Sequence, residues 1–117
     1  MKTNVNTTFK QQMQEIMNLA WRIFKVTGDT FADCLRRAWM NYKLRCAMMT
    51  RIVRFAYIKK STGELRTAIG TTDPHRYEYT PTGNGRQGNF ADCVQYYDKE
   101  ADGFRMFKTY NLVSAEL

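Results

Sequence analysis

The sequence has few of the residues that form disulfides or bind metal ions. Among 117 residues there are three cysteines and one histidine. Cys34, Cys46 and Cys93 are widely spaced, form no C-x-x-C pair, and have only His75 to join them. An odd number of isolated cysteines favours neither a disulfide framework nor a structural zinc site. We therefore expect no metal ion or cofactor, and three reduced cysteines that are partly packed in the core.

Long apolar runs are also absent. No segment approaches the roughly 18 uninterrupted apolar residues that a membrane-spanning helix needs, although 44% of the residues are hydrophobic. The N-terminal segment MKTNVNTTFKQQ contains neither the apolar segment nor the small-residue cleavage site of a signal peptide. We expect a soluble, cytoplasmic protein without membrane association, and the length predicts a single domain over residues 1–117.

The sequence offers no recognisable set of catalytic side chains. No serine lies in a nucleophile elbow, and the acidic residues stand mostly in predicted turns, as Asp73, Asp98, Glu100 and Asp102 do. The segment Gly83–Gly88 satisfies G-x-G-x-x-G, but it neither follows a predicted strand nor opens a helix, as a phosphate-binding loop requires. We therefore expect a non-enzymatic protein with no small-molecule substrate.

Two amphipathic helices are predicted over residues 9–48. Thr8 and Gln11 have the spacing of a capping box before a first helix over about 9–26, and Thr30 with Asp33 begins a second after the break at 27–29. The apolar stripe of the first helix is expected to comprise Phe9, Met13, Ile16, Met17, Ala20 and Phe24. That of the second is expected to comprise Phe31, Leu35, Ala38, Trp39, Tyr42 and Cys46. The short connection predicts an antiparallel helical hairpin.

Alternating apolar residues after position 50 predict strands. Residues 51–72 form a β-hairpin pattern with a turn at 61–63, in which Gly63 is free to take a positive φ. Its expected core residues are Val53, Phe55 and Tyr57 on one strand and Leu65, Thr67 and Ile69 on the other. Further strands are predicted near 94–97, 104–108 and 112–115. The fold class is therefore α+β: an N-terminal helical hairpin followed, over 51–117, by a small SH3-like antiparallel β-barrel of about five strands.

A long polar loop interrupts the strands. Residues 71–89 contain both prolines of the chain and three glycines, and they have few apolar side chains to bury. We expect this loop to be the most mobile internal segment. Its side chains Tyr77, Tyr79 and Arg86 are candidate contacts to a partner.

The positive charge of the chain is unevenly distributed. The net charge is +7, but residues 1–60 hold twelve Lys and Arg against three acidic residues, whereas residues 61–117 hold six against eight. Clustered cations bind nucleic-acid phosphates and release counterions, which supplies affinity. The candidate phosphate-binding residues are Arg36, Arg37, Lys43, Arg45, Arg51 and Arg54. On a helix, Arg36 and Lys43 lie on one side, away from the predicted apolar stripe.

Several short patterns together resemble a known family. The chain is similar, from about residue 20 to 115, to small SH3 β-barrel fold-containing proteins encoded by gut bacteria, their mobile elements and their phages. The resemblance implies a fold and a genomic setting but no catalytic residues. Phe104 stands where a tryptophan is expected and Met106 where a small residue is expected, and neither change threatens a barrel. The patterns that carry the resemblance are Ala38-Trp39 with Lys43, Val53-Arg54-Phe55, Ile58-Lys59-Lys60, Gly63, Arg66, Ala68, Gly70-Thr71, Tyr96-Tyr97-Asp98 and Phe104-Arg105-Met106-Phe107.

These observations leave two hypotheses for function. The first is a non-enzymatic nucleic-acid-binding accessory protein of a phage or mobile element, which binds the phosphates of DNA or RNA through a basic helical face. The alternative is a protein-interaction module that inhibits a host defence protein or forms part of a virion. Its partner would be an acidic protein surface, contacted through Tyr77 and Tyr79.

Overall fold

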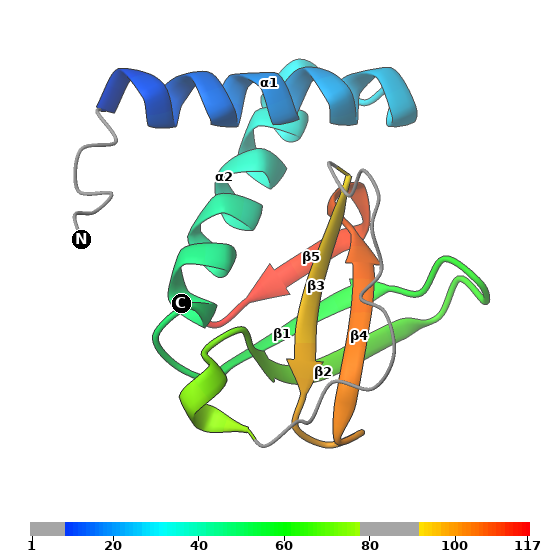
Figure 1. Ribbon diagram of the computed structural model, residues 1–117. Coiled ribbons are helices and arrows are strands. Elements are labelled where there is room, and N and C mark those ends of the chain that lie inside the picture. Colours follow the sequence, from blue (N-terminus) through cyan, green and yellow to red (C-terminus); the bar gives the residue numbers. More distant parts are fainter. Residues whose placement is uncertain (1–8, 78–91) are drawn as a thin grey trace, which may run out of the picture.

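The computed structural model describes residues 9–77 and 92–117. It contains two helices and five strands, as predicted, and this confirms the α+β class (Figure 1). Within these ranges no helix is long and apolar enough to cross a membrane. The helices are α1 (Phe9–Thr27) and α2 (Phe31–Met48), with two short 3-10 helices, η2 (Pro74–Arg76) and η3 (Thr109–Asn111). The strands are β1 (Val53–Ile58), β2 (Leu65–Thr71), β3 (Cys93–Asp98), β4 (Gly103–Lys108) and β5 (Leu112–Ala115). The greater part of the predicted mobile loop, with Tyr79 and Arg86, lies outside the described residues.

Local sequence chemistry determines where the helices begin and end. The hydroxyl of Thr30 accepts a hydrogen bond from the backbone N–H of Asp33 (3.2 Å), which is the N-cap that the sequence predicts for α2. The backbone N–H of Gly28 donates to the carbonyl of Phe24 (2.9 Å) at the end of α1. In Figure 1, α1 lies across the beginning of α2, and α2 runs from α1 to the sheet.

The buried faces of both helices differ from the predicted stripes. Phe9 and Phe24 of α1 and Cys46 of α2 are exposed, so these three predictions are wrong. The sequence pattern could not show that α2 packs against α1 with its first half and against the sheet with its second. Because α2 packs against both partners, its buried side chains form a line along the helix from Cys34 to Met48. The buried residues are Ile16, Leu19, Ala20 and Ile23 in α1 and Cys34, Ala38, Asn41, Leu44 and Met48 in α2.

Two apolar clusters result, and α2 contributes to both. The helical cluster lies between α1 and the first half of α2, and the sheet cluster lies between the second half of α2 and the strands. Between them the buried amide of Asn41 donates to the carbonyls of Arg37 (2.8 Å) and Thr109 (3.0 Å). The hydrogen bond to Thr109 fixes η3, and therefore the start of β5, against α2. The helical cluster comprises Ile16, Leu19, Ala20, Ile23, Cys34 and Ala38. The sheet cluster comprises Leu44, Met48, Val53, Phe55, Tyr57, Ala68, Val94, Tyr96, Phe107 and Leu112.

The five strands form one antiparallel sheet in the order β4-β3-β2-β1-β5. The β3–β4 hairpin crosses the β1–β2 hairpin at a steep angle, so that the sheet curls around its apolar cluster (Figure 1). Val53, Phe55 and Tyr57 of β1 are buried, as predicted. At the tip of the β1–β2 hairpin Gly63 has φ 76°, the conformation expected for that turn.

The predicted core face of β2 is wrong. Leu65 and Thr67 are exposed, whereas the residues that pair with the buried side chains of β1 are Arg66, Ala68 and Gly70. The small residues are required because large rings fill the interior of the sheet. A Cβ atom at Gly70 would lie 2.4 Å from Cδ2 of the fully buried Tyr96. Packing against Tyr96 therefore decides which face of β2 is buried, and it outweighs the hydrophobicity of Leu65, which would favour burial of the other face.

We expect Gly70→Ala to lower the free energy of unfolding by about 2 kcal/mol, because the added methyl group overpacks a filled interior. The matched control is Gly103→Ala, whose new Cβ would have its nearest neighbour, Nη1 of Arg105, at 3.8 Å. Urea denaturation followed by circular dichroism measures both. Equal stability of the two variants would contradict the packing described for Gly70.

Candidate nucleic-acid interface

The six basic residues predicted to bind phosphate do not form one surface. Arg36 and Lys43 are seven residues apart and share one side of α2, as predicted, but Arg45 is about half a turn away from Arg36 and points to the opposite side. Arg51 and Arg54 lie beyond the helix, beside the C-terminal residues. The Arg51 guanidinium donates to the carbonyl of Leu117 (3.4 Å), and the Arg54 carbonyl accepts from the N–H of Glu116 (2.9 Å).

Acidic residues near the start of α2 neutralise two of these cations. Arg36 forms an ion pair with Asp33 (2.8 Å), and Arg37 forms one with Asp29 (2.9 Å). The Nζ atom of Lys43 lies 5.7 Å from the centre of the Trp39 ring, within the range of a cation–π contact. The predicted basic helical face is therefore weaker than its sequence suggests.

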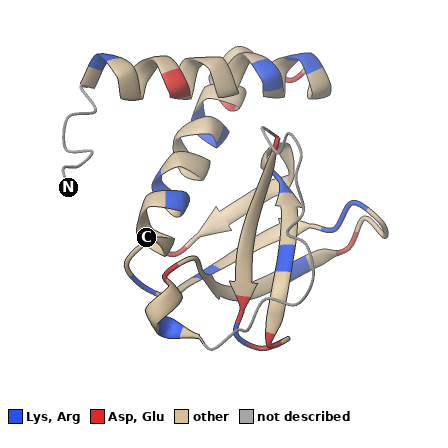
Figure 2. Ribbon diagram, in the orientation of Figure 1, with Lys and Arg blue, Asp and Glu red and all other residues tan. Residues whose placement is uncertain are grey.

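A second group of cations gathers on the sheet, in a groove between the β1–β2 turn and β4. The groove has a volume of about 500 Å³, and none of the described residues that line it is acidic. Figure 2 shows basic segments on β4 and in the β1–β2 turn. Except for Arg66, these cations have no ion-pair partner among the residues that the structure describes. We call this the cationic groove, and its basic residues are Lys59, Lys60, Arg66, Arg105 and Lys108.

The floor of the cationic groove is apolar and firmly packed. The rings of Tyr57 and Phe107 are buried and stack with their centres 4.9 Å apart. The hydroxyls of Tyr57 and Tyr96 share a buried hydrogen bond of 2.7 Å. Burial is the larger cause and this hydrogen bond the smaller one, and together they raise the pKa of Tyr96 well above its ordinary value. The phenol therefore stays neutral. The floor therefore contributes no charge, and the cations set the potential of the groove.

Arg66 is held in the groove by a fully buried carboxylate. Its Nη2 atom donates to Oδ2 of Asp98 (2.6 Å), while Oδ1 of Asp98 accepts from the backbone N–H groups of Glu100 (2.9 Å) and Ala101 (3.1 Å). Burial alone would raise the pKa of Asp98, but these three donors outweigh it and hold the pKa below its ordinary value. The expectation that Asp98 lies in a turn is therefore wrong, because it ends β3 inside the core.

A lysine and a cysteine meet at the rear of the cationic groove. The Nζ atom of Lys108 donates to Sγ of Cys93 (3.3 Å), and this contact raises the pKa of the lysine. Cys93 is half-buried, Cys34 is buried and Cys46 is exposed, and all three are free thiols. This agrees with the prediction of reduced cysteines that are partly packed in the core.

Tyr77, a predicted partner contact, is half-buried and packs against the barrel. Its ring stacks on Tyr97 with centres 4.2 Å apart and meets the edge of Phe104 at 5.6 Å. The two other loop candidates, Tyr79 and Arg86, lie outside the described residues. The structure therefore leaves little of the Tyr77 ring for a partner.

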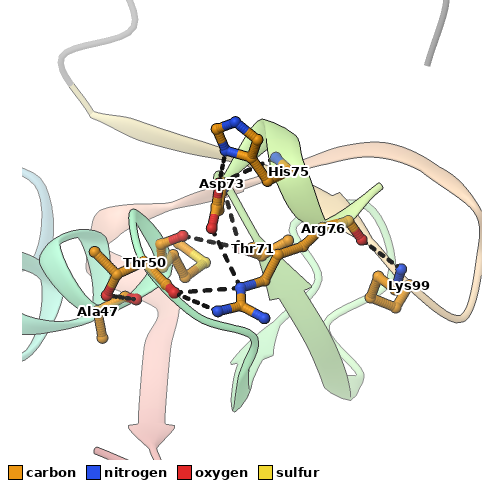
Figure 3. Close-up of polar contacts among 8 residues, drawn as sticks. Ala47, Thr50, Thr71, Asp73, His75, Arg76 and Lys99 are labelled. Atoms are coloured by element: carbon orange, nitrogen blue, oxygen red, sulfur yellow. Dashed lines mark hydrogen bonds and ion pairs between the residues drawn. The ribbon is translucent and has the colours of Figure 1, made fainter. Parts of the chain in front are cut away.

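The segment before Tyr77 is tied to the body of the protein by polar contacts (Figure 3). Arg76 donates to the carbonyl of Thr50 (2.8 Å) and forms an ion pair with Asp73 (3.2 Å). Lys99 donates to the carbonyl of Arg76 (2.7 Å). The His75 side chain is 92% exposed, as expected of a solvated residue. These bonds fix η2 between the end of α2 and the β3–β4 turn.

Comparison with known proteins adds one match. A family model described as "WYL_2, Sm-like SH3 beta-barrel fold" matches residues 41–113. No curated protein and no solved structure matches the chain. The matched stretch contains the whole sheet cluster and every basic residue of the cationic groove, whereas α1 and the first half of α2 precede it. Among the described residues, no group of three or more His, Cys, Asp or Glu could hold a metal ion.

We expect Asp98→Asn to lower the free energy of unfolding by about 3 kcal/mol at pH 7, because it leaves the Arg66 charge without its buried partner. The folded-state pKa of Asp98 lies below the ordinary value, so its stabilising effect is present above about pH 4 and is lost as the pH falls through the folded-state pKa. The difference between the wild-type protein and the variant should therefore shrink in acid. Denaturant unfolding at pH 7 and pH 3 measures it.

The control for Asp98→Asn is Asp33→Asn, which breaks the exposed ion pair with Arg36. Solvent screens that pair, so its loss should change stability far less. A difference between wild type and Asp98→Asn that persists unchanged at pH 3 would show that the carboxylate charge does not hold the strands together.

Proposed function

This chain belongs to the WYL_2 family of Sm-like SH3 β-barrels, and from the charge distribution on its barrel we propose that it binds nucleic acid without catalysing a reaction. The barrel itself agrees with the predicted SH3-like architecture. One observation carries the proposal: five basic side chains line one groove that no described acidic side chain lines, and four of them, all but Arg66, have no ion-pair partner among the described residues. Cations that converge without acidic neighbours attract phosphates, and this attraction supplies most sequence-independent affinity for nucleic acid.

The arrangement of the cationic groove favours the phosphate backbone as its ligand. Lys60 and Arg105 are exposed on opposite walls, and Lys59 and Lys108 are half-buried beside them. Long basic side chains on two walls can contact successive phosphates of one strand. The floor gives no hydrogen-bonding pattern that would select a base, because the hydroxyl of Tyr57 already bonds to Tyr96. We therefore expect binding of DNA and RNA with little sequence specificity.

This proposal moves the phosphate contacts from α2 to the barrel. The predicted helical cations Arg36 and Arg37 are already paired with acidic side chains, whereas Lys59, Lys60, Arg105 and Lys108 have no such partner within the described residues. A cation without an acidic partner gains more from a phosphate, since no ion pair must be broken first. An accessory role in a phage or mobile element remains part of the proposal and rests on the sequence resemblance alone.

The test compares two doubly substituted variants with equal changes in charge. Lys60→Glu with Arg105→Glu alters the cationic groove, and Arg36→Glu with Lys43→Glu alters the helical face. Fluorescence anisotropy with labelled single-stranded DNA, single-stranded RNA and duplex DNA measures the affinity at several salt concentrations. For the groove variant we expect affinity for single strands to fall at least about tenfold and the salt dependence (log K against log salt) to be shallower by about 1.4. The helical variant should bind like the wild-type protein.

Either of two results would overturn this proposal. If the wild-type protein bound none of the three nucleic acids at low salt, the nucleic-acid function would be wrong. If the helical variant lost affinity and the groove variant did not, the function would stand but the site would lie on α2. Circular dichroism of both variants checks that they are folded.

A further inference from the structure

Part of β3 has an edge that no described residue pairs with. β2 and β3 pair only at Gly70 with Asp98 and at Thr71 with Tyr97, because the chain leaves the sheet after Thr71. β3 itself continues back to Cys93 and pairs with β4 along its whole length. The first half of β3 therefore has β4 on one side and, within the described part of the chain, no strand on the other.

The direction of the unpaired backbone groups follows from the register. The N–H of Lys99 donates to the carbonyl of Ile69 in β2 (2.9 Å). In an antiparallel sheet alternate residues direct their backbone N–H and C=O groups to the same neighbour. Tyr97, Gln95 and Cys93 therefore face the β2 side, whereas Val94 and Tyr96 face β4. At Gln95 and Cys93 no strand among the described residues meets these groups.

This edge opens into a second groove, distinct from the cationic groove. It has a volume of about 530 Å³ and is lined by residues of α1, α2 and β3. We call it the junction groove, because α1 precedes the stretch that matches the family and β3 lies within it. The buried hydroxyl of Thr109, which lines the groove, has no hydrogen-bond partner among the described residues. The polar side chains from α1, α2 and β3 that line the groove are Glu15, Asn18, Arg22, Tyr42, Arg45 and Gln95.

The charges of the junction groove favour an acidic ligand. Arg22 pairs with Asp92 (3.0 Å), but Arg45 is exposed and has no ion-pair partner among the described residues. Among the described residues, Glu15 is the one acidic side chain that lines the groove, and it comes from α1. A ligand that approaches along β3 toward α2 therefore meets an unpaired guanidinium. An arginine presents a planar set of donors that suits a carboxylate.

We propose that the junction groove binds an extended acidic peptide segment of a partner protein, which adds to β3 as an antiparallel or parallel strand. Main-chain hydrogen bonds to Gln95 and Cys93 supply affinity, and alternate side chains of the peptide face α1 and α2. A carboxylate of the peptide pairs with Arg45. Cys93 to Gln95 spans roughly 10 Å of strand, which matches a peptide of about three to five residues. This interaction does not depend on nucleic-acid binding, because the cationic groove lies on the other side of Cys93, which lines both.

Amide exchange of the free protein is the first test. By NMR, the amides of Val94 and Tyr96, which bond to β4, should exchange slowly, and the amide of Gln95 should exchange at least about tenfold faster. Strong protection of the Gln95 amide in the free protein would mean that the edge is already paired within the chain, and that result would overturn the proposal.

Peptide selection is the second test. A displayed library of random peptides of about ten residues is selected against the full chain, with Gln95→Pro and Gln95→Ala as matched variants. Proline removes the edge N–H and leaves the pairing with β4, whereas alanine removes only the side chain. We expect selected peptides to be acidic, to bind Gln95→Pro at least tenfold more weakly than Gln95→Ala, and to bind the cationic-groove variant without loss.

A change in the peptide avoids any doubt about the folding of Gln95→Pro. N-methylation of alternate peptide bonds along one edge of a selected peptide should abolish binding, whereas methylation along the other edge should leave it unchanged. If no peptide were enriched, if peptides bound Gln95→Pro as well as wild type, or if methylation of neither edge mattered, strand addition at β3 would be ruled out. A preference for basic peptides would overturn the assigned role of Arg45.

Discussion

The buried carboxylate of Asp98 is the constraint on which the arrangement of the sheet depends. A charge with no exposure to water must be met by donors, and here they come from Arg66 on β2 and from two backbone N–H groups of the β3–β4 turn. These bonds join β2 and β3 at the point where only two residue pairs hold the strands together. They also fix Arg66 at the wall of the cationic groove. One ionised side chain therefore links the stability of the barrel to the geometry of its basic surface.

The elements themselves could be predicted because their signals are local. The Thr30 cap and the turn glycine Gly63 act within a few residues, and each occurs as predicted. The predicted core residues of β1, Val53, Phe55 and Tyr57, are also buried, although Ala56 between them is buried as well. The buried faces were harder to predict. The inward face of β2 depends on the Tyr96 ring against Gly70, and the line of α2 from Cys34 to Met48 depends on two different partners. The residues that constrain β2 and α2 lie in other parts of the chain, so the sequence of each segment does not show which of its faces is buried.

The candidate site also depends on contacts between segments that lie far apart in the chain. A cluster of basic residues in sequence predicts a binding face on α2, but Asp33 in the first turn of the helix and Asp29 just before it pair with part of that cluster. The cations of the groove come from the β1–β2 turn, from β2 and from β4. The β1–β2 hairpin and β4 stand far apart in the chain, and they meet because the β3–β4 hairpin crosses the β1–β2 hairpin (Figure 1). The pairing of Arg66 with Asp98, 32 residues away, gave no sequence signal either.

In the proposed function the cationic groove, and not α2, contacts phosphate. The most direct measurement is a backbone NMR titration of the isotope-labelled chain with single-stranded DNA. We expect the largest shift changes on the amides of Lys59, Lys60, Arg105 and Lys108, and unchanged shifts for the amides of Arg36 and Lys43. Shift changes concentrated on α2, with the β1–β2 turn and β4 unaffected, would contradict this expectation.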